Sequence, residues 1–199
     1  MATREAFLAK VRQAQPAARP RPAVPLFAAT GGAGGDLRAR FTAALQVMGG
    51  TCVEVQAASE VASLIRERFG AAVSVASATA EVPGTRELTA STEPASLQDV
   101  DVGVVRARFG VAETGSVWFS EREYVVNALG YIVQHLVVLL DPAQLLNGLQ
   151  DVYRRDDFRD ARYAALVTGP SATADIEGVL IRGAQGVRSL TVVWLADNL

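Results

Sequence analysis

The stretch YIVQHLVVLLD, residues 131–141, decides the fold class. It contains five consecutive strongly apolar residues, 136–140, between polar neighbours. A continuous apolar run of this length is typical of a strand that is buried on both faces, as in a parallel sheet. Parallel strands need crossover connections, which are usually helices, so the run favours an α/β protein.

Strand and helix patterns alternate on both sides of this run. The predicted strands have short apolar or alternating patterns and cover residues 51–55, 72–76, 101–107, 110–119, 136–140, 163–167 and 190–195. The predicted helices have apolar residues at helical spacing and cover residues 3–14, 37–48, 59–69, 142–154 and 173–182, with Asp36 and Ser59 as N-caps and Pro142 at one start. This alternation predicts a three-layer α/β fold, in which a mostly parallel sheet has helices on both faces.

The first 29 residues have a different composition from the rest. A short helix is followed by PAARPRPAVP, which holds four of the eight prolines and predicts an extended linker. We expect residues 1–29 to pack loosely or to reach a partner, and residues 30–199 to form the α/β domain. The glycine-rich run TGGAGGD, residues 30–36, fits neither phosphate-loop spacing and predicts a flexible entry to the next helix.

Composition excludes several classes of chemistry. With 19 basic and 21 acidic residues the net charge is −2, which argues against nucleic acid as a partner. Lys10 is the only lysine, and it is far from any glycine-rich motif, so Schiff-base or P-loop chemistry is not expected. Cys52 and His135 are the only residues of their types, which excludes an internal disulfide, a cysteine-ligated cluster and a multi-histidine metal centre within the chain. This leaves oxygen-ligated metals or none. We expect no metal and no resident cofactor.

The sequence shows no membrane or secretion signal. Its longest strongly apolar run is far shorter than the roughly 20 residues that span a bilayer. The N-terminal stretch MATREAFLAKVRQAQ mixes acidic and basic residues and lacks a continuous apolar segment. A cytoplasmic location is the expectation.

Two loops have the composition of a binding site. They are Glu113-Thr114-Gly115-Ser116 and the segment GPSATADIE, residues 169–177. In α/β folds ligands bind at the carboxyl ends of strands, where loops lead into helices, and we expect both loops to lie there.

The first loop places a carboxylate beside two hydroxyl groups and a flexible glycine. Glu113 is a candidate catalytic residue, as a base or a nucleophile, and an acceptor for a ligand hydroxyl. The other interpretation is a tight turn between strands, whose hydroxyls satisfy the backbone. We prefer ligand contact without covalent chemistry.

The second loop is expected to start a helix that Ser171 or Thr173 caps. Asp175 and Glu177 would then lie in the first turn, at the positive end of the helix dipole. Two carboxylates there would repel a phosphate, whereas a hydroxyl or an amide would be tolerated. A well-capped structural helix is the alternative. His135 is expected to bond a neighbouring backbone group.

Three segments resemble the lactate-utilisation protein C family (LutC/YkgG), whose domain is called LUD. They are FGVAETGSVWF, YIVQHLVVLLD and VTGPSATADIEGVLIRGAQG, within a match of roughly residues 36–199. The family's ETGT has Ser116 in place of threonine here, and its GPS-x-TADIE has Ala172 at the variable place. The family's VHGP-like turn is replaced by residues 184–187, AQGV, so no role of that histidine is carried over.

The resemblance implies a fold like that of the NagB/RpiA/CoA-transferase group. It also implies a role in oxidising L-lactate to pyruvate beside iron–sulfur partner subunits, with this chain as a cluster-free accessory or ligand-binding subunit. A hydroxy- or keto-acid is the expected small molecule. The alternative is a stand-alone enzyme resembling CoA-transferases or folate cyclo-ligase. The expected ligand-binding residues come from the two loops: Glu113, Thr114, Gly115, Ser116, Gly169, Pro170, Ser171, Thr173, Asp175 and Glu177.

Overall fold

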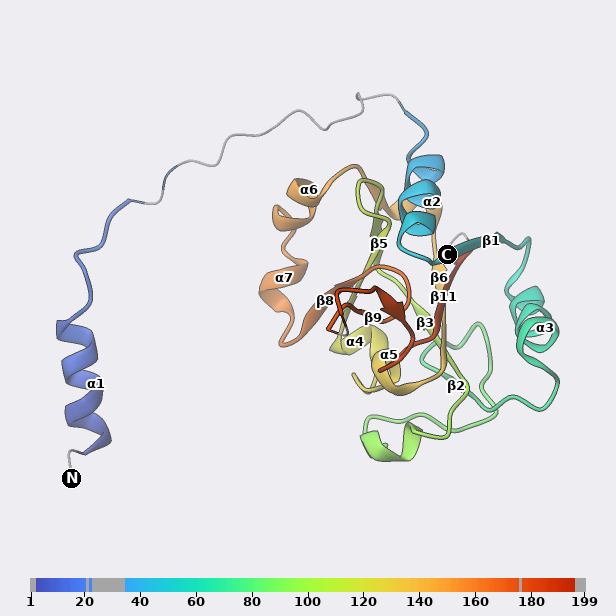
Figure 1. Cartoon of the computed structure of the whole chain (residues 1–199), viewed down its shortest axis with the longest axis horizontal. Helices are drawn as coiled ribbons and strands as arrows, with labels where there is room; N and C mark the ends of the chain where they lie inside the picture. Colours follow the sequence, from blue (N-terminus) through green and yellow to red (C-terminus); the bar gives the residue numbers. More distant parts are fainter. Residues whose placement is uncertain (1–2, 21, 23–34, 176, 196–199) are drawn as a thin grey trace.

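The computed structural model describes residues 3–20, 22, 35–175 and 177–195. The glycine-rich run up to residue 34 and most of the linker after residue 20 lie outside these residues. Helix α1 (Arg4–Gln13) forms as predicted, and Thr3 caps it by accepting a hydrogen bond from the Ala6 amide at 3.3 Å. None of its residues is buried, and it stands apart from the rest of the described chain (Figure 1).

A five-stranded parallel sheet forms the centre of the fold, in the order β1-β11-β6-β3-β2. Its strands are β1 (Thr51–Glu54), β2 (Val75–Ser77), β3 (Val102–Arg106), β6 (His135–Leu140) and β11 (Ser189–Trp194). The mostly parallel sheet and the α/β class are confirmed. The second strand begins three residues later than predicted, because the backbone of Val75 pairs with Val102 while residues 71–74 form a turn and coil.

The apolar run of β6 explains why this strand is central. Val137 and Leu139 pack in a core cluster with helix α3 (Ala58–Phe69), whereas Leu136, Val138 and Leu140 pack in the cluster on the other face. Both faces of the strand are therefore buried, as the sequence predicts. On the α3 side, Val61 and Ile65 are buried against the sheet.

The start of α3 differs from the prediction. Its N-cap is Ala57, and Ser59 lies inside the first turn. The Glu60 carboxylate instead accepts a hydrogen bond from the Gln56 amide at 3.0 Å. The prediction of Ser59 as the N-cap was therefore wrong by two residues, because the Glu60 side chain binds the backbone just before the helix.

Helix α2 and a second sheet cover the other face of the central sheet. Asp36 caps α2 (Leu37–Val47) as predicted, accepting from the amides of Arg38 and Ala39. The second sheet has the order β7-β4-β5-β8, with β7 (Leu145–Leu146), β4 (Phe109–Val111), β5 (Ser116–Ser120) and β8 (Ala164–Val167). Short helices α4 (Glu121–Tyr124) and α5 (Leu129–Ile132) complete this layer, with the 3-10 turn η1 (Pro94–Leu97).

The predicted single helix over residues 142–154 was wrong. The chain forms a 3-10 turn, η2 (Pro142–Gln144), then β7, and only then helix α6 (Leu149–Tyr153). The two leucines of β7 pair with β4 in parallel, and this pairing interrupts the helix. Helices α6 and α7 (Asp157–Asp160) cover the outer side of the second sheet around Trp118.

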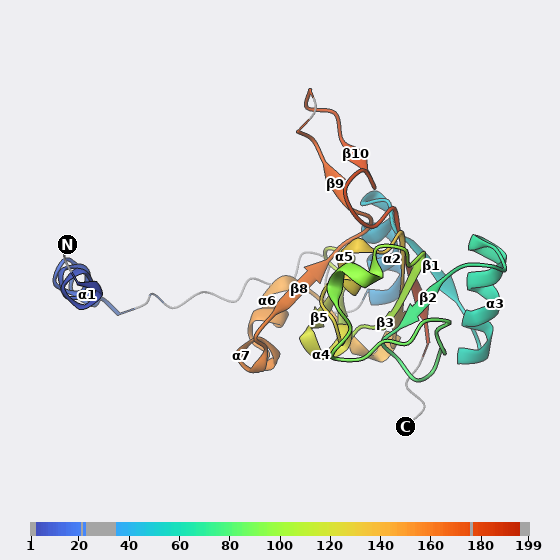
Figure 2. The ribbon, with the colours of Figure 1, turned by 90° about the horizontal axis from the view of Figure 1, so that it is seen from below.

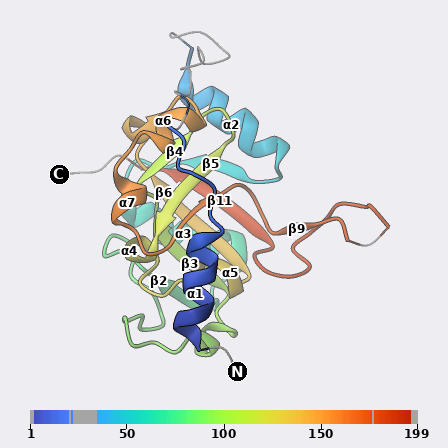
Figure 3. The ribbon, with the colours of Figure 1, turned by 90° about the vertical axis from the view of Figure 1, so that its left-hand side faces the viewer.

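The predicted helix over residues 173–182 was also wrong. This segment forms an antiparallel hairpin of β9 (Ala172–Thr173) and β10 (Ile181–Arg182). Glu177 and Gly178 near its tip have positive φ angles of 54° and 70°, which a helix does not allow. The hairpin stands out from the body of the protein (Figures 2 and 3).

Candidate functional site

The first predicted loop is the tip of the β4–β5 hairpin in the second sheet, so it does not lead from a strand into a helix as expected. The Gly115 amide donates to the carbonyl of Val111 at 2.9 Å, and Gly115 has φ +66°. A Cβ at Gly115 would lie 2.3 Å from the backbone nitrogen of Leu45. The glycine is therefore required for the close approach of the hairpin tip to α2.

The Glu113 carboxylate holds the start of α6. Its Oε2 accepts a hydrogen bond from the Leu149 amide at 2.9 Å, and the Glu113 amide donates to the carbonyl of Asn147 at 3.1 Å. A Cβ at Gly148 would lie 2.8 Å from Oε2, so this glycine makes room for the carboxylate. Glu113 is exposed and acts as a hydrogen-bond acceptor at the start of α6.

A chain of hydroxyl groups joins the two predicted loops. Thr114 and Ser116 share a hydrogen bond of 2.7 Å between their side chains, and Ser116 shares another of 2.5 Å with Thr168. Thr168 directly precedes the second loop, and Ser116 is only 4% exposed. The two motifs are thus held together at a buried polar contact.

A surface hollow of about 570 Å³ lies over this contact, and we call it the loop hollow. Glu113, Thr114, Ser116 and Thr168 supply its polar groups. The rest of the lining is mostly apolar: Ala44, Val47, Met48, Leu149, Tyr153 and Leu166. No basic side chain lines it, so a ligand hydroxyl or amide fits there better than a ligand carboxylate.

The second loop leaves β8 and lines a neighbouring hollow of about 350 Å³. Gly169 has φ +67°, and a Cβ there would lie 2.6 Å from the carbonyl oxygen of Met48. The Ser171 hydroxyl donates to the carbonyl of Gln185 at 2.9 Å, and the Ser171 amide donates to that of Val187 at 2.9 Å. Ser171 is thus held by the turn that replaces the family's VHGP, and it caps no helix.

The last part of the second motif lies on the β9–β10 hairpin. The Thr173 hydroxyl donates to the Asp175 carboxylate at 3.0 Å, in an exposed local turn. Thr173, Asp175 and Glu177 line neither hollow. The structure therefore brings Glu113, Thr114 and Ser116 to one hollow and residues 169–171 to the next, and it separates the acidic end of the motif from both.

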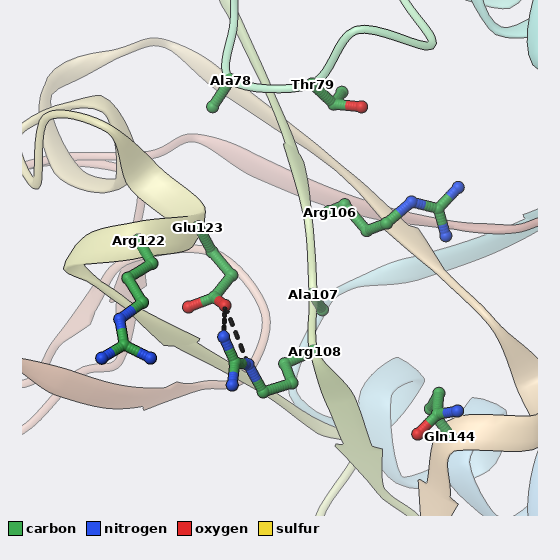
Figure 4. Close-up of a pocket in the computed structure, with 8 residues that line it drawn as sticks. All are labelled: Ala78, Thr79, Arg106, Ala107, Arg108, Arg122, Glu123 and Gln144. Atoms are coloured by element: carbon green, nitrogen blue, oxygen red, sulfur yellow. Dashed lines mark hydrogen bonds and ion pairs between the residues drawn. The ribbon is translucent and has the colours of Figure 1, made fainter. Parts of the chain in front are cut away.

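A third hollow, of about 490 Å³, lies past the carboxyl ends of three central strands, and we call it the arginine pocket. Figure 4 shows its lining: Ala78 and Thr79 after β2, Arg106, Ala107 and Arg108 at and after the end of β3, Arg122 and Glu123 of α4, and Gln144 after β6. Ligands of open α/β sheets bind in this position.

Two of the three arginines in this pocket are held by carboxylates. Arg108 donates to Glu123 at 2.9 and 2.7 Å and to Asp157 at 3.1 Å, and these contacts hold the pKa of its guanidinium high despite partial burial. Arg106 donates to both carboxylate oxygens of Glu81, which lowers the pKa of Glu81. Figure 4 shows the two guanidiniums turned away from each other.

Arg122 differs from both. It is exposed, and its Nη2 donates to the carbonyl of Asp160 at 3.3 Å. Among the described residues it forms no ion pair with a carboxylate. Sequence reasoning missed Arg122 and Gln144 as site residues. Arg106 and Arg108 alternate in the sequence, but their guanidiniums turn away from each other, so this alternation does not mark the pocket.

His135 lies at the opposite, amino end of the central sheet. Its Nδ1 is 2.8 Å from the Ser189 hydroxyl, so its partner is a side chain and not the predicted backbone group. The ring stacks on Phe69. Burial, and then the charge of Arg188, lower the pKa of His135, so the neutral imidazole is favoured.

Burial raises the pKa of the Cys52 thiol on β1.

The described part of the chain lacks two features. Within residues 3–20, 22, 35–175 and 177–195, no helix is long and apolar enough to cross a membrane. The same residues contain no group of three or more histidine, cysteine, aspartate or glutamate side chains suited to a metal ion.

These features define an α/β protein with a parallel central sheet, a second sheet packed on it, and small surface hollows at the strand ends. The chain belongs to the LUD domain family, whose model matches residues 94–195, just over half of the chain. This family is associated with lactate utilisation, and the match confirms the resemblance seen in the sequence.

One solved structure is similar in fold. It is the crystal structure of a DUF162 family protein from Deinococcus radiodurans, which has 19% sequence identity and a TM-score of 0.58. The match covers 79% of this chain and 95% of that protein. No curated protein matches the chain significantly.

Proposed function

We propose that this chain is a cytoplasmic, cluster-free component of an iron–sulfur system that oxidises L-lactate to pyruvate. The LUD domain supports the lactate context. The single cysteine supports the division of labour, because cysteine-ligated clusters need several thiolates, which partner subunits would provide. The chain's own contribution is to bind a small hydroxy- or keto-acid and to complete the complex.

The observation that carries this proposal is the junction of the two family motifs at Ser116 and Thr168. It fixes Glu113 and Thr114 at the edge of the loop hollow. Glu113 keeps one carboxylate oxygen on α6, and its other oxygen can accept a hydrogen bond from a ligand hydroxyl. We assign Glu113, Thr114, Gly115 and Ser116, with Gly169, Pro170 and Ser171, to ligand contact or to shaping this surface.

The exposed acidic end of the second motif suits a different role. Thr173, Asp175 and Glu177 project on the β9–β10 hairpin, beside the exposed side chains of Val179 and Leu180. We assign this hairpin to contact with a partner subunit, since an apolar tip that projects from the body is typical of a docking surface. Thr173, Asp175 and Glu177 would then contact the partner subunit, and would contribute to ligand binding only in the assembled complex.

The test is purification of the tagged full chain under mild conditions from its native cells grown on lactate. We expect cysteine-rich, brown proteins to co-purify, and the mixture to reduce an electron acceptor with L-lactate. Glu113→Gln keeps an oxygen that can cap α6, so it tests the carboxylate charge without removing the helix contact. A chain that elutes alone and colourless would contradict the proposal and would favour a stand-alone enzyme resembling CoA-transferases or folate cyclo-ligase.

A further inference from the structure

Helix α1 carries an apolar stripe that the described part of the chain leaves uncovered. Phe7, Leu8 and Val11 lie on one side of the helix, since residues three and four apart share a face. Phe7 and Val11 are exposed, and no residue of α1 is buried. A helix of 10 residues gains most of its stability from packing of its apolar face, so α1 needs a surface to pack on.

The loop hollow offers an apolar surface of matching character. Val47, Met48 and Tyr153 line it, although these side chains are 76%, 46% and 72% exposed. Exposed apolar side chains that gather at one hollow mark an interaction site. Among the described residues that line the hollow, Glu113 carries the only charge.

The charge of α1 complements this carboxylate. The helix contains three basic residues, Arg4, Lys10 and Arg12, against one acidic residue, Glu5, so its side chains carry a net charge of +2. Lys10 and Arg12 precede and follow Val11, and at roughly 100° per residue they lie on either side of the apolar stripe. Packing of the stripe on the hollow would therefore bring a basic side chain to its edge.

The linker favours the hollow of another molecule. Residues 14–36 join α1 to α2, and a chain of this length can extend over roughly 70 Å. Pro16, Pro20 and Pro22 lie in neither a helix nor a strand, and proline-rich segments act as extended spacers. In Figure 1 α1 stands apart from the rest of the described chain, so its own hollow does not hold it. A second copy of the chain supplies an identical hollow.

We propose that α1 of one copy packs its apolar stripe on the loop hollow of a second copy, in both directions. Because the helix and the hollow belong to the same chain, a two-fold dimer uses both surfaces at once and closes the assembly. The second copy then supplies the basic side chain, Lys10 or Arg12, that the described lining of the hollow lacks. Such a cation would bind the carboxylate of an acid whose hydroxyl contacts Glu113. This last step rests on the proposed function, whereas the docking of α1 does not.

The experiment is zero-length carbodiimide cross-linking, which joins an amine to a carboxylate in contact with it. Lys10 is the only lysine of the chain, and Glu113 lines the hollow, so the link between them reports this one contact. Two full-length variants are mixed and allowed to exchange: Lys10→Arg keeps the carboxylate, and Glu113→Gln keeps the amine. We expect a product of twice the chain mass, in which peptide mass spectrometry identifies the Lys10–Glu113 link.

Substitutions on α1 test the apolar stripe. Phe7→Ser with Val11→Ser in the otherwise unchanged chain should weaken the dimer by roughly tenfold or more, as measured by light scattering during size-exclusion chromatography. Thermal unfolding should not change, because α1 buries no side chain. Ala9→Ser with Gln13→Ser is the matched control, since these residues lie on the opposite side of the helix, and it should leave the dimer intact.

Three results would overturn the proposal. The first is a full chain that is monomeric. The second is a dimer that Phe7→Ser with Val11→Ser does not weaken, or in which the mixed variants give no link between Lys10 and Glu113. The third is a Lys10–Glu113 link in the wild-type protein that joins residues of a single chain only, which would place α1 on its own body. None of these results decides the proposed function, because co-purification with iron–sulfur partners is measured separately.

Discussion

Ser116 on β5 and Thr168, directly after β8, share a hydrogen bond of 2.5 Å between their hydroxyl groups. The two residues are 52 positions apart in the sequence, yet the pairing of β5 with β8 brings them together. Because Thr114 extends the chain of hydroxyls, the two family motifs form one hydrogen-bonded unit. The contribution of this hydrogen-bonded unit to the free energy of unfolding can be measured without knowing the ligand.

Ser116→Ala should reduce the free energy of unfolding by about 1–2 kcal/mol, because Thr168 and Thr114 lose their shared partner. Urea unfolding measures this difference. Thr89→Ala is the control, since Thr89 bonds Ser91 and Thr92 in an exposed turn, and its cost should be below about 0.5 kcal/mol. Equal losses in the two variants would contradict a special role for the buried contact.

Gly115→Ala should destabilise the protein by roughly 3 kcal/mol or more, because the methyl group would meet the α2 backbone and the positive φ adds strain. Gly178→Ala has a similar φ of +70° but open space around the new methyl group. Its cost should stay near 1 kcal/mol. Thermal unfolding of both variants compares the clash with the backbone strain alone.

Arg108→Leu should lower the free energy of unfolding by about 1–3 kcal/mol, because Glu123 and Asp157 would lose a shared partner while only 11% and 12% exposed. Arg159→Leu removes an ion pair whose side chains are 83% and 78% exposed, and it should cost less than about 0.5 kcal/mol. Chemical denaturation at neutral pH separates the two. A small effect of Arg108→Leu would show that the remaining partners of these carboxylates, Ser120 for Glu123 and Arg155 for Asp157, are sufficient.

His135 should make stability fall as the pH decreases below about 6.5, the ordinary pKa of histidine. The folded-state pKa is lowered, so the unfolded chain binds the proton first, and protonation favours unfolding in this window. His135→Gln should flatten the dependence between about pH 6.5 and pH 5. Urea unfolding of both proteins across this range measures the free energy of unfolding at each pH. The same pH dependence in both proteins would contradict the contribution of His135.

The central sheet could be predicted because its strands are marked by apolar runs. Residues 136–140 and 190–195 both became central strands, since only a doubly covered position buries so many apolar side chains. The two helix predictions that were wrong, over residues 142–154 and 173–182, rested on residues typical of helix N-termini, Pro142 and Ser171 or Thr173. Local capping patterns do not reveal that Leu145 and Leu146 are needed to extend a sheet, or that Glu177 and Gly178 adopt positive φ angles.

The candidate site was predictable only where its residues are neighbours in the sequence. Glu113, Thr114 and Ser116 meet in one hairpin, and the strand pairing then brings Thr168 to them. Arg122 and Gln144 line one pocket with Arg106 because α4 and the ends of β2, β3 and β6 lie around it. No single stretch of sequence contains that relationship.

The place of β11 in the sheet affects how the chain must be made. This strand, Ser189–Trp194, pairs with β1 on one side and β6 on the other, so the last of the described strands lies inside the sheet. During synthesis β1 has no neighbour to pair with until residues 189–194 have left the ribosome. The central sheet is therefore incomplete until β11 is made, and loss of β11 would leave β1 unpaired beside the three-stranded piece β6-β3-β2.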